Sequence, residues 1–223
     1  MALERELKFS SPEGVVPALQ ELQAALAPLG AGATDLGARE HSDVYFDDPA
    51  STVQRAGMAL RIRTTAGARV ATLKSRGSVI AGVHERDEFE VTLPPAAAGA
   101  PQQWPAGFAP LLPHTDMSRL APHMLISTLR HRFALLQDGA PVAELAFDEV
   151  ACRPAAEVAL SYSIDEVLFH EVELEALVTG SRQPVSAARL SEYGAALQEL
   201  LPLYPSDITK LERAATLLAA FLE

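Results

Sequence analysis

The chain has 223 residues, of which 48% are hydrophobic and 21% charged, a composition typical of a globular protein with one large domain or two small ones. Its net charge of −11 argues against nucleic acid as the main partner, because nucleic-acid-binding proteins usually present a basic surface. A single cysteine (Cys152), no evident signal peptide and no apolar stretch of membrane-spanning length together predict a cytoplasmic protein without a membrane partner.

The first half of the chain predicts several strands and one helix. Charged and apolar residues alternate over 2–9, which indicates a strand. Leucines at helical spacing predict a helix over 12–29 that ends at Gly30, and Ser10 and Glu13 stand at capping-box spacing before it. Further strands are expected over 34–47, 58–65, 68–76 and 83–93, with a turn near Ala66-Gly67 and a loop over 77–82.

The second half predicts more strands and two closing helices. Residues 94–122, which contain the only tryptophan, Trp104, are expected to form a long connection. Strands are predicted over 125–137, 141–152 and 162–177, with Asp138-Gly139 as a hairpin turn, and helices over the leucine-containing stripes 190–200 and 211–222. About eight strands with short connections favour an α+β fold built on an antiparallel barrel-like sheet.

Carboxylates recur at every second position on three predicted strands. These are Glu4 and Glu6, Glu88 and Glu90, and Glu171, Glu173 and Glu175. Side chains two residues apart share a strand face, so like charges repel there unless a cation lies between them. Carboxylate clusters without His or Cys suit Mg²⁺ or Mn²⁺. Solvated strand faces remain an alternative, and hairpin structure explains the further candidate Asp148 equally well.

Basic residues form same-face pairs on other predicted strands. The pairs are Arg61 with Arg63, Lys74 with Arg76, and Arg130 with Arg132, and Arg86 joins Glu88 and Glu90. Guanidinium groups bind phosphate oxygens bidentately, and ammonium groups neutralise them as point charges. Surface ion pairs are the alternative, but they contribute little to stability and do not account for the sorting of charge by strand. The pattern favours a site that holds metal ions and a polyanion together.

The ordered motifs resemble the CYTH superfamily, the triphosphate tunnel metalloenzymes, along almost the whole chain. Glu4-x-Glu6-x-Lys8 is similar to the signature of the first strand, and Tyr45-Phe46-Asp47-Asp48-Pro49 to the second strand and its turn. The later matches are Ala59-Leu60-Arg61-Ile62-Arg63, Thr72-Leu73-Lys74, Gly82-Val83-His84-Glu85-Arg86, Glu88-Phe89-Glu90, Arg130-His131-Arg132, Ala146-Phe147-Asp148, Glu171-Val172-Glu173-Leu174-Glu175 and Thr209-Lys210-Leu211-Glu212-Arg213. Thr209 replaces the usual Ser, and Ala214-Ala215 replaces the common Gly-Tyr.

The resemblance implies a single domain over 1–223, an eight-stranded antiparallel tunnel that binds a linear triphosphate with Mg²⁺ or Mn²⁺. The catalytic residues it implies are Glu4, Glu6, Lys8, Glu173, Glu175 and Lys210. The phosphate-binding residues are Lys8, Arg61, Arg63, Lys74, Arg86, Arg130, Arg132 and Lys210. The metal ligands are Glu4, Glu6, Asp148, Glu171, Glu173 and Glu175.

The length and the long connection are most similar to bacterial inorganic triphosphatases, which predicts hydrolysis of tripolyphosphate to pyrophosphate and phosphate. A thiamine triphosphatase, a class IV-type adenylyl cyclase and a non-catalytic polyphosphate-binding module are the alternatives. An organic substrate usually needs an aromatic platform, for which Tyr45, Phe46 and Phe89 are the candidates. The sequence leaves open the oligomeric state, with a homodimer among the states considered, and whether a helical polyphosphate-associated domain follows Glu223.

Overall fold

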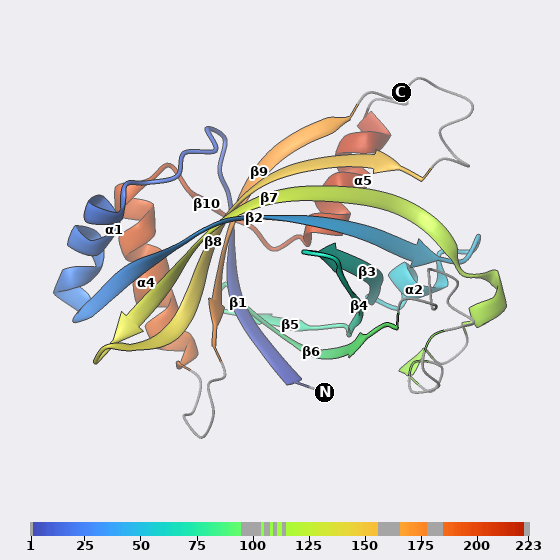
Figure 1. The fold of residues 1–223 in the computed structure, drawn as a ribbon, viewed down its shortest axis with the longest axis horizontal. Helices are drawn as coiled ribbons and strands as arrows, with labels where there is room; N and C mark the ends of the chain where they lie inside the picture. Colours follow the sequence, from blue (N-terminus) through green and yellow to red (C-terminus); the bar gives the residue numbers. More distant parts are fainter. Residues whose placement is uncertain are drawn as a thin grey trace.

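Eight antiparallel strands form a closed barrel at the centre of the molecule (Figure 1). In order around the barrel they are β1 (Ala2–Ser10), β9 (Val167–Ala176), β8 (Ala140–Pro154), β7 (Ala121–Gln137), β2 (Ala31–Asp47), β3 (Ala59–Thr65), β4 (Ala68–Lys74) and β6 (Val83–Thr92). Pairing of β6 with β1 closes the barrel, with Glu4 opposite Arg86. The computed structural model describes residues 2–94, 104, 108, 111–112, 115–155, 166–177 and 185–220. The predicted eight-stranded antiparallel barrel with flanking helices is confirmed.

Two short strands and two short helical segments complete this framework. Strand β5 (Ser78–Ile80) pairs with β6, and β10 (Tyr204–Pro205) pairs with the end of β1. Helix α2 (Thr52–Arg55) follows β2, and a 3₁₀ turn, η4 (Met117–Arg119), precedes β7. No helix in the described part of the chain is long and apolar enough to cross a membrane.

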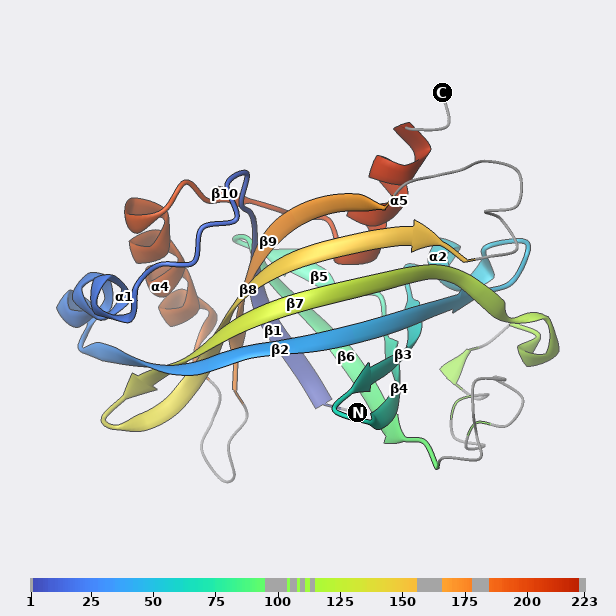
Figure 2. The same ribbon diagram turned by 45° about the horizontal axis from the view of Figure 1, so that its top comes forward.

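Two helices cover the outer face of the barrel at one end. Helices α1 (Leu19–Leu26) and α4 (Ala187–Leu200) lie side by side where the long strands diverge (Figures 1 and 2). Leu22 of α1 and Tyr193 of α4 are fully buried there, in one cluster with Leu7 and Phe9 of β1. Because Leu7 and Phe9 alternate with Glu6 and Lys8, this packing leaves the charged face of β1 turned to the barrel interior.

A second apolar cluster covers the outer face of β3 and β4. Phe46, Leu60 and Leu73 pack there with Trp104 and with Phe108, Leu112 and Leu120. Trp104 is 6% exposed, and its ring stands edge-on to that of Phe46 with the centroids 5.3 Å apart. The tryptophan that the sequence places in a connection is therefore part of the core, because it shields the outer face of these strands from water.

Helix α5 (Lys210–Ala220) packs on the inner face of the barrel at the end away from α1 and α4 (Figure 2). Ala214 and Leu218 are buried against Ile126 and Val150. These two strand residues share the faces that carry Arg130 and Asp148, by the alternation of side chains along a strand. Helix α5 therefore covers the barrel interior next to the charged residues, and it carries Lys210 as its first residue.

The predicted start of the first helix is wrong. The helix expected over 12–29 begins at Leu19 and passes into the 3₁₀ turn η1 (Ala27–Leu29), although it ends at Gly30 as predicted. Ser10 and Glu13 form no cap; instead Glu21 accepts a hydrogen bond from the backbone N–H of Ala18 at 3.0 Å. A proline disfavours helical backbone at the residue before it, so Pro17 keeps Val16 out of the helix and delays its start.

The loop expected over 77–82 contains the strand β5. Ala81 and Gly82, with φ of 52° and 78°, form a tight turn that pairs Ile80 with Val83. The predicted turn at Ala66-Gly67 is confirmed, since both residues have positive φ. The strand predicted over 162–177 is seen as Val167–Ala176, and residues 156–165 lie outside the described part of the chain.

Candidate active site

A cavity of about 240 Å³ lies inside the barrel and is lined mostly by charged side chains. Seven of the eight barrel strands and the start of α5 contribute to its wall. Ten of the predicted site residues line it: Glu4, Lys8, Arg61, Arg63, Lys74, Arg86, Arg130, Glu173, Glu175 and Lys210. The strand alternation read from the sequence therefore turns these side chains to one common space.

Glu4 and Glu6 on β1 are bound to cations of the same cavity. Arg86 donates to Glu4 through Nε at 2.6 Å and to Glu6 through Nη2 at 2.7 Å. Lys74 donates to Glu4 at 2.6 Å, and Lys8 lies 3.2 Å from Glu6. Burial alone would raise the pKa of Glu4, but the charges of Lys74 and Arg86 lower it to about 2. Glu4 is therefore ionised at neutral pH.

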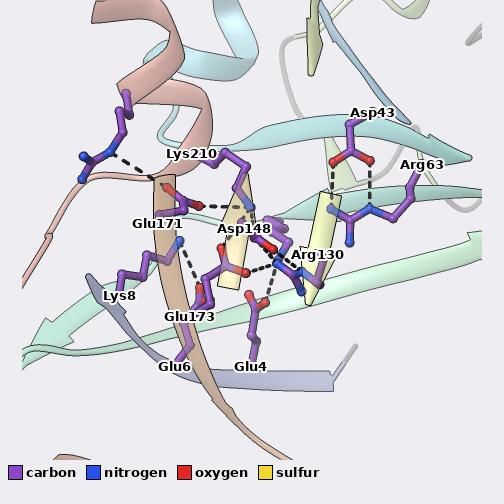
Figure 3. A network of polar contacts seen from close by, with 12 residues as sticks. Glu4, Glu6, Lys8, Asp43, Arg63, Arg130, Asp148, Glu171, Glu173 and Lys210 are labelled. Atoms are coloured by element: carbon purple, nitrogen blue, oxygen red, sulfur yellow. Dashed lines mark hydrogen bonds and ion pairs between the residues drawn. The ribbon is translucent and has the colours of Figure 1, made fainter. Parts of the chain in front are cut away.

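Asp148, Glu171 and Glu173 form a carboxylate cluster beside the cavity, and Glu173 lines it (Figure 3). One oxygen from each lies within 4.8 Å of the others. Lys210 donates to Asp148 at 2.7 Å, and Arg130 makes a bidentate contact with Asp148 at 2.8 and 2.6 Å and also binds Glu173. Burial opposes ionisation of Asp148, but the charges of Lys210 and Arg130 lower its pKa.

Asp43 on β2 holds the two arginines of β3. It accepts hydrogen bonds from Nε and Nη2 of Arg63 at 2.8 and 2.7 Å, and Nη1 of Arg61 lies 3.4 Å away. Register explains the contact, because Asp43 stands opposite Arg63. Asp43 is 0% exposed. Sequence reasoning missed this residue because Asp43 is an isolated acid on its strand face, with no carboxylate two residues away.

Four predicted site residues do not line the cavity. Glu6, Asp148 and Glu171 lie directly behind it, and each contacts a cation that does line it. Arg132 is different: its nearest described carboxylate is Glu144, at 3.4 Å. Arg132 shares a strand face with Arg130, but it lies two residues further along the barrel, past the cavity.

Glu175 lines the cavity next to other carboxylates. On the neighbouring strands it stands opposite Glu6 and Glu144. Burial raises the pKa of Glu175 to about 8, and the charge of Glu4 contributes. At neutral pH this side chain is therefore largely a neutral acid.

The two aspartates of Tyr45-Phe46-Asp47-Asp48-Pro49 have a structural role. Asp47 accepts hydrogen bonds from the backbone N–H groups of Val53 and Gln54, each at 3.0 Å. Asp48 accepts one from the N–H of Thr52, also at 3.0 Å. These bonds satisfy the free donors at the start of α2 and fix the turn after β2. Tyr45 is the part of the motif that lines the cavity.

The carboxylate cluster fits a hard divalent cation. All of its donors are carboxylate oxygens, the ligand type that Mg²⁺ and Mn²⁺ prefer. Oε1 of Glu171 is buried and makes no hydrogen bond among the described residues. Glu4, Glu6 and Glu175, the other predicted metal ligands, lie outside this cluster of the described residues.

The protein is thus a closed antiparallel β-barrel whose interior holds paired carboxylates and cations. The CYTH domain model matches residues 2–215, so the chain belongs to the CYTH domain family.

Three solved structures share the fold. The Hippeastrum protein HpAC1, a candidate adenylyl cyclase with a dominant triphosphatase activity, is 20% identical, with a TM-score of 0.62 over 96% of this chain and 95% of that one. A candidate adenylate cyclase from Bacillus halodurans is 18% identical, with a TM-score of 0.55 over 96% and 98% of the two chains. One from Vibrio parahaemolyticus is 12% identical, with a TM-score of 0.51 over 95% and 98%.

Proposed function

We propose that this protein is a metal-dependent hydrolase that cleaves inorganic triphosphate to pyrophosphate and phosphate inside the barrel. The observation that carries the proposal is the small cavity lined by cations from many strands, with a carboxylate cluster beside it. A linear triphosphate carries several negative charges along its length and matches such a lining. The family and the triphosphatase activity of HpAC1 support this choice.

The size and lining of the cavity favour an inorganic substrate over an organic one. Its volume of about 240 Å³ is below the roughly 300–1,000 Å³ of pockets that enclose drug-sized ligands. Phe46 packs on Trp104, and Phe89 packs on Phe108, both in the outer cluster. Among the described residues Tyr45 is the one aromatic side chain in the lining. A nucleoside or thiamine group would therefore find little to stack on.

The cations act on the phosphoryl oxygens. Lys8, Lys74 and Arg130 come from different strands, so they can contact successive phosphates of one chain. Arg61 and Arg63 add two guanidinium groups whose positions are held by Asp43. Charge that develops on the oxygens during the reaction then meets cations already in place. Asp148, Glu171 and Glu173 would hold Mg²⁺ or Mn²⁺, and the ion would act as a Lewis acid toward the phosphoryl group and would acidify a water.

The test is to incubate the protein with tripolyphosphate, ATP or thiamine triphosphate in the presence of Mg²⁺ or Mn²⁺. Phosphate, pyrophosphate and cyclic AMP are then assayed. We expect phosphate and pyrophosphate from tripolyphosphate. Cyclic AMP from ATP would indicate a cyclase, and binding without any product would indicate a polyphosphate-binding module.

The carboxylate cluster is tested by Glu173→Gln, which should abolish metal-dependent turnover while the circular dichroism spectrum is retained. The matched control is Glu149→Gln, an exposed residue of β8. It should keep the wild-type rate. Full activity of Glu173→Gln would refute the assignment of the cluster.

A further inference from the structure

The ammonium group of Lys210 lies among the three carboxylates of the cluster (Figure 3). Its Nζ is 2.7 Å from Oδ2 of Asp148, 3.0 Å from Oε1 of Glu171 and 3.5 Å from Oε1 of Glu173. These are the same residues whose oxygens converge to within 4.8 Å. Lys210 therefore already occupies the place that a divalent cation bound by this cluster would take.

The charges of the cluster are nearly balanced. Three carboxylates face three cations. Lys210 and Arg130 both bind Asp148, whose side chain is 0% exposed, and Nε of Arg213 lies 3.9 Å from Oε2 of Glu171. A divalent ion added to this arrangement would leave an excess of positive charge in a buried site. Like charges a few ångströms apart repel strongly where water is largely excluded. The cluster therefore has room for the ammonium or for the divalent ion, but not for both.

Glu171 shows that Lys210 is an imperfect ligand for the cluster. The residue is 4% exposed, and its Oε1 makes no hydrogen bond among the described residues although Nζ of Lys210 lies 3.0 Å away. The ammonium has three directed donors, whereas an ion accepts oxygens from any direction. A buried carboxylate oxygen without a hydrogen bond is costly, which favours replacement of the ammonium by a better ligand.

The side chain of Lys210 can also reach the central cavity. Lys210 also lines the central cavity, as do its neighbours Thr209 and Leu211. Its ammonium can therefore turn from the cluster toward the cavity while α5 stays packed through Ala214 and Leu218. A polyanion in the cavity would be a new partner for the displaced charge.

We propose that the Lys210 ammonium and a divalent cation exchange at the cluster formed by Asp148, Glu171 and Glu173. Entry of the metal moves Lys210 into the cavity, where it becomes a phosphate-binding group. The second half of this proposal rests on the proposed function, whereas the competition with the metal stands on the geometry of the cluster. Metal and triphosphate then bind with positive coupling, because each removes an obstacle to the other.

The competition is tested with Mn²⁺ alone, followed by the loss of its free electron paramagnetic resonance signal. We expect Lys210→Met to bind Mn²⁺ at least tenfold more tightly than the wild type. Arg132→Met is the matched control, because it removes one positive charge from the barrel at a residue that contacts Glu144 and not the cluster. It should change the affinity less than threefold. Equal effects of the two variants, or no Mn²⁺ binding by Lys210→Met, would overturn the proposal.

The wild-type protein offers a second test that does not depend on a variant. The chain has three lysines, Lys8, Lys74 and Lys210, so their side-chain methylene signals can be resolved by nuclear magnetic resonance. Saturation with Mg²⁺ should move the Lys210 signal most. A Lys210 signal that stays in place at saturation would also overturn the proposal. Neither experiment contains a phosphate compound, so failure of the proposed hydrolysis would be seen separately.

Discussion

At Asp43, the effect of a side chain's charge on anion binding can be separated from its effect on the geometry of a neighbouring arginine. Replacing Asp43 by Asn makes the cavity more positive, which by charge alone should tighten binding of an anion. The same change removes the bidentate carboxylate that orients Arg63. Charge-assisted bidentate contacts fix a guanidinium in place, so we expect the loss of geometry to prevail. Asp43→Asn should weaken binding of tripolyphosphate about tenfold, the equivalent of roughly 1.4 kcal/mol.

Titration calorimetry without divalent metal measures this effect. Glu90→Gln is the control, because Glu90 lines the same cavity and accepts a hydrogen bond from Thr72 rather than from an arginine. It removes the same charge and should tighten binding. An Asp43→Asn protein that also binds more tightly would show that Asp43 acts through charge alone.

His41 should make the protein less stable in acid. Burial, together with the charges of Arg63 and Arg130, lowers the pKa of His41 to about 4. An unfolded chain binds this proton near pH 6.5, so stability is lost as the pH falls through the window between the two values. Since the ring is only partly buried, we expect a loss of about 1 kcal/mol between pH 7 and pH 5 from this residue.

Urea unfolding at the two pH values provides the measurement. In His41→Gln the acid-induced loss should be smaller by that amount, while the exposed His123→Gln should behave as the wild type. The same pH dependence in all three proteins would remove His41 as its source.

At the scale of elements, the cap of α5 explains why Thr can stand at position 209, where the family motif usually has Ser. Thr209 accepts a hydrogen bond from the N–H of Glu212 at 3.2 Å, and Glu212 accepts one from the N–H of Thr209 at 2.7 Å. This is a capping box, in which Thr serves as well as Ser. The replacement of Ser by Thr therefore preserves the start of the helix that carries Lys210.

Removal of this cap should destabilise the protein. Thr209→Ala is expected to cost about 1 kcal/mol of unfolding free energy, as for other N-cap threonines. Thr216→Ala on the same helix is the control, because its hydroxyl donates to a carbonyl already within the helix. That change should stay within about 0.5 kcal/mol. Thermal or urea unfolding compares the two variants, and an equal loss in both would argue against the capping role.

Alternation of side chains made the strands and the charged faces predictable, but not the depth of each residue in the barrel. Glu4, Lys8 and Arg130 were expected to face one site, and all three line the cavity. Arg132 lies on the same strand face as Arg130 and yet lies beyond the cavity. A period of two specifies the face of a strand and not the position along the barrel axis. The role of Asp43 follows only from its pairing with β3, a long-range contact that no local pattern encodes.

For the molecule as a whole, an acidic protein with a cationic interior should bind its substrate in a salt-dependent way. The net charge is −11, while the cavity carries lysines and arginines from many strands. Added salt screens the attraction between these cations and a polyanion, with a Debye length of about 10 Å at 0.1 M and about 3 Å at 1 M. We expect the affinity for tripolyphosphate to fall several-fold over that range of KCl. Sucrose at matched osmolality serves as the control, and a flat response to salt would contradict the expected electrostatics.

The position of the sole tryptophan determines what optical spectroscopy can observe in this protein. Trp104 is buried with Phe46 and Phe108 on the outside of the barrel wall, and Tyr45 lines the cavity. Intrinsic tryptophan emission should therefore follow the unfolding of that outer cluster and remain nearly constant when a ligand enters the barrel. A tryptophan introduced at Tyr45, in a protein whose Trp104 is replaced by Phe, would place the fluorophore where the ligand binds.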